Sequence, residues 1–413
     1  IIGKVSPIQP TGNNDKVFKD SSEIFKSNVT GVIDRVHTGI YNSEGYELYN
    51  VRVRMERVPI IGDKFCLKGD TQILTDSGWK KISTIDIKKD KVATIDKNYG
   101  LYYTNPSEKF EFDYDDEMFY YKNKHVMIDC TMNHKLYVRL RGKENYELIK
   151  AKDLNKRKCQ VLKNCVNNKK STEFITINNI KYNTNSFLQL VGAYISDGNV
   201  NNNKVIISCV KERKVNFCRK FLNELNIDYQ YKDDKIQFIN KNISNYMKNM
   251  GNNAVSKKLN TDLLNLSEEE SKILLDSLLQ GDGHTDKNGF SRYTTISSEL
   301  ADDVSILAFN SGYSSHIKKE INKNITRCGI RNLGERKGEF IKVTQKHDVY
   351  RVSIIRKHNN AWMFKKDNPS NIYKTYNFKG KVYSIEVPES HIYYMRNDKL
   401  SPPLWIGNSN RHG

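Results

Sequence analysis

Side chains suited to acyl transfer stand at two distant places in this sequence. Cys66 carries a thiol, and a thiolate is the best nucleophile among protein side chains, so Cys66 can attack the carbonyl carbon of Phe65 and convert an amide into a thioester. Near the end of the chain, the side-chain amide of Asn408 can close onto its own carbonyl, and the Ser409 hydroxyl can accept an acyl group. These residue types predict intramolecular acyl transfers that need neither a metal nor a nucleotide.

Two further carboxylates end two similar apolar segments. Phe187–Gly198 and Ile273–Gly283 each predict a helix with small residues on one face, and each ends in Asp-Gly, where glycine is a common helix stop. One Asp-Gly at a helix end is usually only a cap. Two of them, Asp197 and Asp282, could together hold a divalent metal around a phosphate.

The residues that follow each apolar segment repeat a pattern, which indicates an internal duplication of αββ units. The first copy predicts a strand, a helix and a strand over Lys204–Ser208, Glu212–Asn226 and Lys235–Ile239. The second copy predicts the same roles for Tyr293–Ser297, Ser298–Ser311 and Val349–Ile355.

The composition favours a basic protein with a polyanionic partner. Lys and Arg number 67 against 48 Asp and Glu, a net charge of +19, so DNA is the first candidate partner and a soluble protein with solvated basic faces is the alternative. The 7 cysteines include no C-x-x-C pair, so a disulfide framework or structural zinc is not expected. No apolar run predicts a membrane span, and neither a signal peptide nor an initial Met is present, which suggests a piece of a longer, non-secreted precursor.

Four sequence blocks resemble the conserved blocks of inteins, which excise themselves from a host protein and join its flanks. The blocks are Cys66–Thr71, Asp129–His134, Gly380–His391 and Gly407–Ser409. The short strands expected at Ile73–Ile82, Val92–Ile95 and Met118–Tyr121 agree with the all-β horseshoe of the Hedgehog/intein (HINT) family. By this resemblance Cys66 and Ser409 are the nucleophiles and Asn408 cyclises.

The same resemblance assigns the assisting residues. His134 would protonate the leaving nitrogen, with Thr131 orienting it or the peptide, and His391 would assist Asn408. Two positions depart from the family. Gly407 stands where a His is usual, and Ser384 stands where an Asp is common.

The flanks provide an independent check. Removing Cys66–Asn408 joins Gly-Asp-Lys-Phe to Ser-Asn-Arg-His-Gly, which resembles a signature of the second-largest (β-like) subunit of multisubunit RNA polymerases. Residues 1–65 resemble the part of that subunit just before the signature, and Lys64 would then lie near the RNA 3′ end. The mature host would be a DNA-directed RNA polymerase subunit, a nucleotidyltransferase.

The two apolar Asp-Gly segments resemble the two motifs of single-chain LAGLIDADG homing endonucleases. That resemblance implies Mg²⁺ held by Asp197 and Asp282, with Lys257 as a catalytic lysine and Lys258 as its alternate. Basic residues on the predicted strands would track DNA phosphates. They are Lys204, Lys235, Arg292 and Arg351. In the second motif Asp276 and Ser277 replace the usual small-then-Gly pair.

The expected fold is therefore mixed: an all-β splicing domain interrupted by a pseudo-dimeric α+β endonuclease, after a β-rich polymerase flank. The expected parts are the flank 1–65, the first splicing segment 66–170, the endonuclease 171–358, a Lys/Asn/Tyr-rich linker with the last splicing segment 359–408, and the second flank 409–413.

The sequence thus predicts a self-splicing intein with a site-specific, metal-dependent endodeoxyribonuclease. Its partners would be double-stranded DNA at the host-gene site lacking the insertion and, after splicing, other RNA polymerase subunits, in a nucleus or the cytoplasmic factory of a large DNA virus. The alternatives are an intein whose nuclease only binds DNA, an inert insertion in a polymerase fragment, and Hedgehog-like cleavage without ligation.

Overall fold

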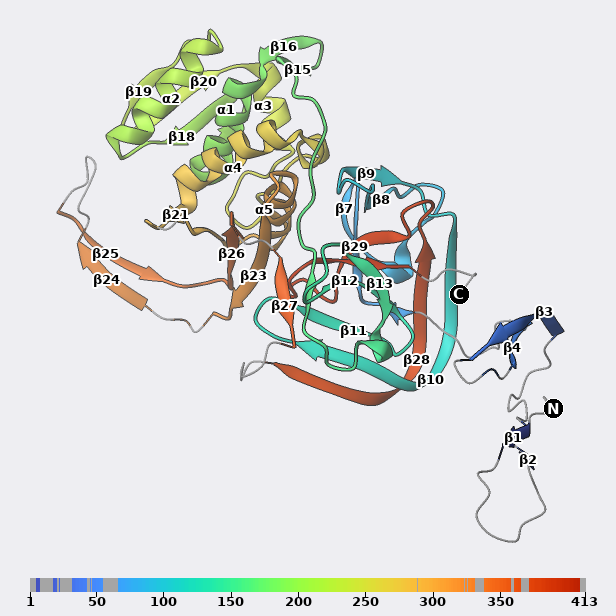
Figure 1. The fold of residues 1–413 in the computed structure, drawn as a ribbon. Helices are drawn as coiled ribbons and strands as arrows, with labels where there is room; N and C mark the ends of the chain where they lie inside the picture. Colours follow the sequence, from blue (N-terminus) through green and yellow to red (C-terminus); the bar gives the residue numbers. More distant parts are fainter. Residues whose placement is uncertain are drawn as a thin grey trace. The chain divides into compact units, whose positions relative to one another are not determined.

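The computed structural model divides the chain into two units, Ile1–Asp63 and Lys64–Gly413 (Figure 1). The residues that it describes are 5–7, 18–20, 22, 32–42, 45, 47–54, 66–287, 289–322, 324, 326–330, 338–357, 360–364 and 371–408. In the first unit β1 (Val5–Pro7) pairs with β2 (Phe18–Asp20), and β3 (Val32–Tyr41) pairs with β4 (Glu47–Arg54), both antiparallel. No helix among the described residues is long and apolar enough to cross a membrane.

The second unit is rich in strands, and its first sheet is a small closed barrel. The barrel contains β5 (Leu67–Lys68), β10 (Glu108–Lys122), β11 (Met127–Thr131) and β28 (Ile372–Glu386). β10 and β28 pair along their whole lengths, from Glu108↔Glu386 to Lys122↔Ile372. The prediction of a linker after residue 358 is therefore wrong for residues 372–379, which were expected to lack strand structure but all pair with β10. The remainder of β28 lies in the block Gly380–His391 that was expected to return to the splicing fold.

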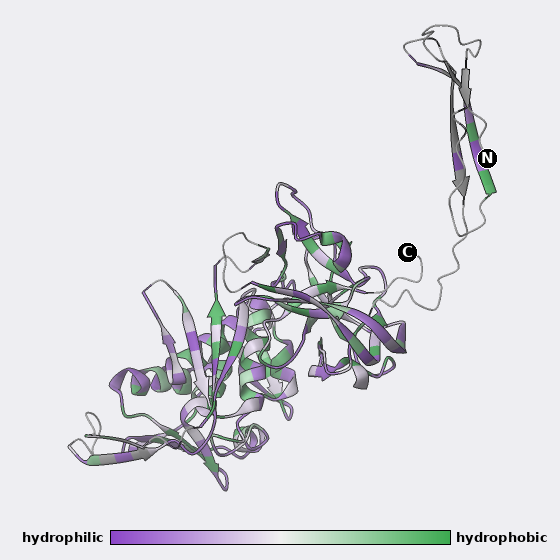
Figure 2. Ribbon diagram, turned by 90° about the horizontal axis from the view of Figure 1, so that it is seen from below, coloured by the Kyte–Doolittle hydropathy of each residue, from purple (hydrophilic) through white to green (hydrophobic). Residues whose placement is uncertain are grey.

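A ten-stranded sheet lies beside the barrel in the order β27-β14-β12-β30-β29-β6-β8-β9, with β13 on β12 and β7 on β6. Its strands are β6 (Gln72–Thr75), β7 (Gly78–Lys81), β8 (Val92–Ile95), β9 (Leu101–Thr104), β12 (Lys135–Leu140), β13 (Glu147–Lys150), β14 (Cys159–Val161), β27 (Ala361–Met363), β29 (Ile392–Arg396) and β30 (Leu404–Gly407). Two 3-10 turns accompany them, at Ile82–Thr84 and Ala151–Leu154. Figure 2 shows both hydrophobic (green) and hydrophilic (purple) residues along the strands.

Between β14 and β27 in the sequence, the chain forms two copies of one α-β-β-α-β-β unit (Figure 1). The first copy is α1 (Thr184–Asp197), β17 (Gly198–Asn201), β18 (Lys204–Ser208), α2 (Glu212–Glu224), β19 (Gln230–Lys232) and β20 (Lys235–Ile239). The second is α4 (Glu268–Asp282), β21 (Gly283–Thr285), β22 (Ser291–Thr295), α5 (Ser298–Asn310), β23 (Ser314–Glu320) and β26 (Val349–Ile355). The sheets run β17-β18-β20-β19 and β21-β22-β26-β23, which is the same order, so the predicted duplication is confirmed.

The remaining elements extend this duplicated pair. The hairpin β15 (Phe174–Ile177) and β16 (Ile180–Asn183) precedes α1, and α3 (Lys241–Lys248) with a 3-10 turn at Thr261–Asn265 joins the two copies. The hairpin β24 (Thr326–Ile330) and β25 (Phe340–Thr344) is inserted between β23 and β26, and the first copy has no counterpart to it.

Helices α1 and α4 cross at small residues. A Cβ built on Gly192 would lie 2.5 Å from Ser277 Cβ, and one built on Gly281 would lie 2.3 Å from Ser196 Cβ. Ser277 stands where the LAGLIDADG motif usually has glycine. It fits there because its partner is Gly192 and because its hydroxyl donates to the Gln189 carbonyl at 2.9 Å. Each contact pairs a serine with a glycine.

The glycines after both helices end them through close approach. Gly198 and Gly283 have φ of −103° and −99°, an extended conformation open to any residue. A Cβ at Gly198 would lie 2.6 Å from Tyr194 Cα, and one at Gly283 would lie 2.4 Å from Leu279 Cα. The chain can therefore turn directly from each helix into β17 or β21 only because these residues lack a side chain.

The crossing leads to a stability prediction. Gly192→Val should lower the free energy of unfolding by about 1–3 kcal/mol, because the new side chain would overlap Ser277 in a closely packed contact. Gly329→Val is the matched control, since no atom lies within 4 Å of a Cβ built there. Urea unfolding of both variants tests the prediction, and equal stability would contradict it.

Candidate functional site

The first junction places the amide nitrogen of Cys66 against Thr131. The Cys66 N–H donates to the Thr131 hydroxyl oxygen at 2.8 Å, and the Thr131 N–H donates back to the Cys66 carbonyl at 3.0 Å. Cys66 is fully buried, and β5 directly after it pairs with β11 and β28. The nitrogen of the Phe65–Cys66 peptide bond is thus fixed by a side chain that the sequence had singled out.

His134 lies in the turn that follows Thr131. Its N–H donates to the Thr131 carbonyl at 3.0 Å, and its carbonyl accepts the Ala151 N–H at 2.8 Å. The side chain is completely buried. The turn therefore brings both predicted assisting residues, Thr131 and His134, to the barrel strand beside Cys66.

The second junction places Asn408 against His391. The Asn408 N–H donates to the His391 carbonyl at 2.7 Å, and Asn408 Nδ2 lies 3.4 Å from His391 Nδ1 and 3.3 Å from the Val387 carbonyl oxygen. Asn408 is fully buried. His391 has a φ of 57°, at the corner before β29. The nucleophilic amide thus touches the predicted histidine, whereas Ser409 and Phe65 lie outside the described residues.

Gly407 occupies a position that has no room for a side chain. A Cβ there would lie 2.5 Å from Leu148 Cδ2 and 2.9 Å from the carbonyl oxygen of Lys135. The backbone oxygen cannot move away, because β12 pairs with both β13 and β30 at this point. The close approach of the strands at Gly407 therefore leaves no room for the histidine that inteins usually have at this position.

In the duplicated pair, Asp197 and Asp282 line one pocket of about 490 Å³ together with Lys257. Burial, and then the nearby charge of Asp197, raise the pKa of Asp282 to about 6. No group of three or more His, Cys, Asp or Glu side chains suited to a metal occurs in the described part of the chain. Two carboxylates still fit Mg²⁺, which keeps several water or phosphate oxygens as ligands.

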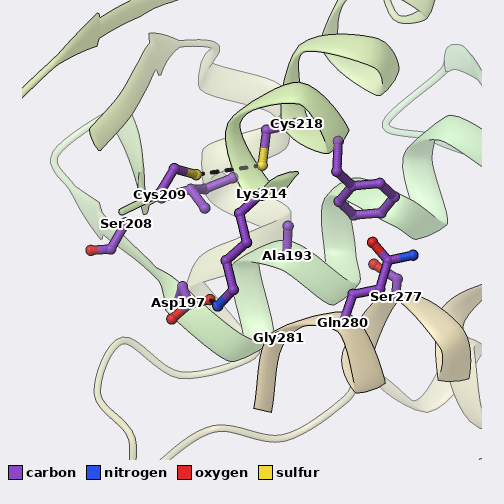
Figure 3. A pocket seen from close by; sticks show the side chains of 11 residues that line it. Ala193, Asp197, Ser208, Cys209, Lys214, Cys218, Ser277, Gln280 and Gly281 are labelled. Carbon is purple, nitrogen blue, oxygen red and sulfur yellow. Dashed lines mark hydrogen bonds and ion pairs between the residues drawn. The ribbon is translucent and has the colours of Figure 1, made fainter. Parts of the chain in front are cut away.

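Asp197 also has a partner that the sequence did not reveal. The ammonium group of Lys214, on α2, forms an ion pair with Asp197 Oδ2, as Figure 3 shows. No motif marks Lys214, and only the fold brings α2 against the end of α1. A cation that binds at Asp197 would have to share or displace this ammonium group.

Lys257 is buried, and its neighbour Lys258 is not. Lys257 Nζ donates to the Tyr194 carbonyl at 2.9 Å and lies 3.4 Å from the centre of the Tyr194 ring. Burial lowers the pKa of Lys257 to about 7. Lys258 is exposed and lies 3.6 Å from Glu299. The geometry therefore favours Lys257 of the two predicted lysines.

The four basic strand residues differ in their surroundings. Lys204, Lys235 and Arg292 are exposed. Arg351 forms an ion pair of 2.8 Å with Glu320, so part of its charge is already balanced.

Comparisons with known proteins give one family match at the start of the chain and several longer relatives. Residues 1–69 match the family model described as RNA polymerase Rpb2, domain 6. A Stigeoclonium helveticum "DNA-directed RNA polymerase subunit beta C-terminal section" is 25% identical over 86% of this chain and 37% of its own length. A Chlamydomonas moewusii "ATP-dependent Clp protease proteolytic subunit" is 29% identical over 62% of this chain and 28% of its own. The chain thus spans about a third of the length of these relatives.

Two solved structures show lower similarity. A split intein, titled "AceL NrdHF class 3", covers 84% of this chain and 100% of its own at 9% identity and a TM-score of 0.29. The homing endonuclease I-DmoI covers 43% of this chain and 92% of its own at 17% identity and a TM-score of 0.27. At these values no residue role is transferred. The resemblance of the start of the chain to a polymerase subunit is confirmed, and the solved structures to which the chain is similar include a split intein and a homing endonuclease.

Restoring the family's usual histidine should harm this chain. Gly407→His is expected to lower the free energy of unfolding by about 1–3 kcal/mol, because its Cβ would overlap Leu148 and the Lys135 carbonyl. Urea unfolding of a Cys66→Ala, Asn408→Ala background, with and without Gly407→His, measures the effect. A more stable variant would contradict the close approach.

Proposed function

We propose that this chain is a precursor that excises residues 66–408 and joins Phe65 to Ser409. The observation that carries the proposal is the pair of junction contacts, Thr131 on the Cys66 nitrogen and His391 on the Asn408 side-chain amide. Both junction residues are buried, which keeps water from competing for the acyl group.

At the first junction the Cys66 sulfur would attack the Phe65 carbonyl carbon. The carbon–nitrogen bond breaks and a thioester forms, while His134 accepts the proton of the thiol and delivers a proton to the Cys66 nitrogen. Thr131 accepts the N–H of that nitrogen before the attack, so it fixes the plane of the peptide bond while the tetrahedral carbon forms.

The Ser409 hydroxyl would then attack the thioester, which transfers the acyl group to oxygen and releases the Cys66 thiol. Asn408 Nδ2 attacks its own carbonyl carbon, and the bond to the Ser409 nitrogen breaks. His391 Nδ1 is close enough to accept the Nδ2 proton when that ring nitrogen is unprotonated. An O-to-N shift leaves a peptide bond between Phe65 and Ser409.

We further propose that the duplicated pair cuts double-stranded DNA at the host-gene site that lacks the insertion. Asp197 and Asp282 would hold Mg²⁺, which when bound supplies charge stabilisation around the scissile phosphate. Lys257, whose pKa is about 7, can accept a proton from the attacking water at neutral pH. The Lys214–Asp197 ion pair favours one alternative, an insertion that still binds DNA without cutting it.

The family match of residues 1–69 supports the proposal that the host protein is an RNA polymerase subunit. After excision, the joined subunit would assemble with other RNA polymerase subunits, in a nucleus or in the cytoplasmic factory of a large DNA virus.

Splicing is tested by intact-mass analysis of freshly expressed protein. The wild-type chain should yield a free Cys66–Asn408 fragment and a product with a Phe65–Ser409 bond. Cys66→Ala should stop thiol-induced release of residues 1–65, because no thioester can form, and Asn408→Ala should stop cleavage before Ser409 while leaving the thioester available. Thiol-induced release from Cys66→Ala would contradict the assignment of the nucleophile.

DNA cleavage is tested on a plasmid that carries the joined host sequence without the insertion. Cleavage should rise with pH and level off above about 7, because only the neutral Lys257 amine accepts a proton and Asp282, with a pKa of about 6, is then ionised. Asp197→Asn or Asp282→Asn should stop cutting and leave splicing intact. DNA binding by a wild-type chain that never cuts would establish the alternative.

A further inference from the structure

Helix α5 of the duplicated pair is held against β29, the strand that directly follows His391. Asp302 on α5 lies 2.8 Å from Arg396 Nη1 and 2.7 Å from Lys399 Nζ. Lys399 also donates to the Ser298 carbonyl at the start of α5, at 2.6 Å. One carboxylate therefore takes two cations, from the last residue of β29 and the turn after it.

Arg396 is buried on the other side by the splicing sheet. Its side chain is 1% exposed, its Nε donates to Gln72 Oε1 at 2.6 Å, and its guanidinium lies 4.3 Å from the centre of the Trp79 ring. A buried cation without its anion strongly destabilises the fold. Arg396 therefore depends on Asp302 for its position.

Aromatic stacking extends the same contact along α5. Phe309 stacks on Tyr394 with ring centres 4.2 Å apart, and Trp405 of β30 lies 5.8 Å from Phe309. Tyr394 donates its hydroxyl to the Lys163 carbonyl at 2.9 Å. The helix and β29 thus share one hydrophobic core.

β29 is the strand that connects the two junctions. On one side Ile392 pairs with Gly407, immediately before Asn408, and on the other side Met395 pairs with Ile73, a few residues after Cys66. His391 directly precedes β29. A shift of β29 would therefore move His391 relative to Asn408, whereas β6 keeps β7 and β8 as further partners.

We propose that Asp302 is a positioning residue for cyclisation of Asn408, acting through Arg396 and β29. This inference rests on the splicing function proposed above. It makes a helix of the DNA-cutting half a working part of the splicing half.

The next residue of α5 serves the other site. Asp303 Oδ2 accepts the Leu259 N–H at 2.8 Å, and the Ser297 hydroxyl donates to the Lys257 carbonyl at 2.6 Å. The start of α5 therefore holds the Lys257 segment on one face and β29 on another, and neighbouring aspartates serve the two separately.

The test compares two acid-to-amide changes in the duplicated pair. Asp302→Asn should slow cleavage before Ser409 on the order of tenfold in a Cys66→Ala chain, because His391 loses its alignment with Asn408. Thiol-induced release of residues 1–65, measured in an Asn408→Ala chain, should stay near the rate of the unsubstituted parent. The matched control is Asp276→Asn on α4, which breaks an ion pair of 2.7 Å with Arg356, the residue after β26.

Two further variants separate positioning from general damage. Asp302→Glu should restore much of the rate, because it keeps the anion. The effects of Asp302→Asn and Arg396→Gln should not add, since both act on one ion pair. Hydrogen exchange at the amides of β29 should rise in Asp302→Asn while the amides of α4 stay protected, which reports the effect even where the variant is less stable.

The outcomes are distinct. A wild-type chain that splices while Asp302→Asn cleaves as fast as Asp276→Asn overturns the role of Asp302. Equal slowing at both junctions, or additive effects with Arg396→Gln, overturns it as well. A wild-type chain that forms neither the thioester nor the excised fragment overturns the proposed splicing function and this inference with it.

Discussion

The pairing of β29 with β6 on one side and β30 on the other is the constraint on which the splicing half depends. The proposed acyl transfer requires that the reacting atoms of the two junctions lie close together. The junctions are far apart in the sequence, so the fold must bring them together. Here one strand is hydrogen-bonded to the segment after Cys66 and to the segment before Asn408. The contact of His391 with Asn408 follows from this arrangement, because His391 precedes β29 and Asn408 follows its partner β30. The contact of Thr131 with Cys66 depends instead on the pairing of β11 with β5 in the barrel.

The site that contains Asp197 and Asp282 depends on a close approach of two helices at residues with small side chains. Asp197 and Asp282 approach one another because α1 and α4 cross at Gly192–Ser277 and Ser196–Gly281. That approach has an electrostatic consequence: burial and a like charge raise the pKa of Asp282. Asp197 instead forms an ion pair with Lys214. Two carboxylates in equivalent positions of the duplication thus have different surroundings.

Local pattern was enough to predict much of this structure. The repeated pattern after the two Asp-Gly segments predicted the duplication and the bounds of β18, β20 and β26, and the short strand expected at Val92–Ile95 is β8. Composition misled at the start of β28, because its partner strand β10 lies far earlier in the sequence, before the duplicated pair. Lys214, Asp302 and the closed space around Gly407 could not be predicted, since each depends on which distant segment lies opposite.

Because α5 and β29 share one hydrophobic core, the duplicated pair and the splicing sheet are not structurally independent. An inserted domain that touches its host only through linkers can be lost without structural cost. In this chain, removing α5 would expose Tyr394 and Trp405, at roughly 25 cal/mol per Å² of apolar surface, and would leave Arg396 buried without its anion. Both terms oppose deletion of the helix, even where DNA cutting itself is no longer selected. The packing therefore links retention of the inserted half to the folding of the splicing half.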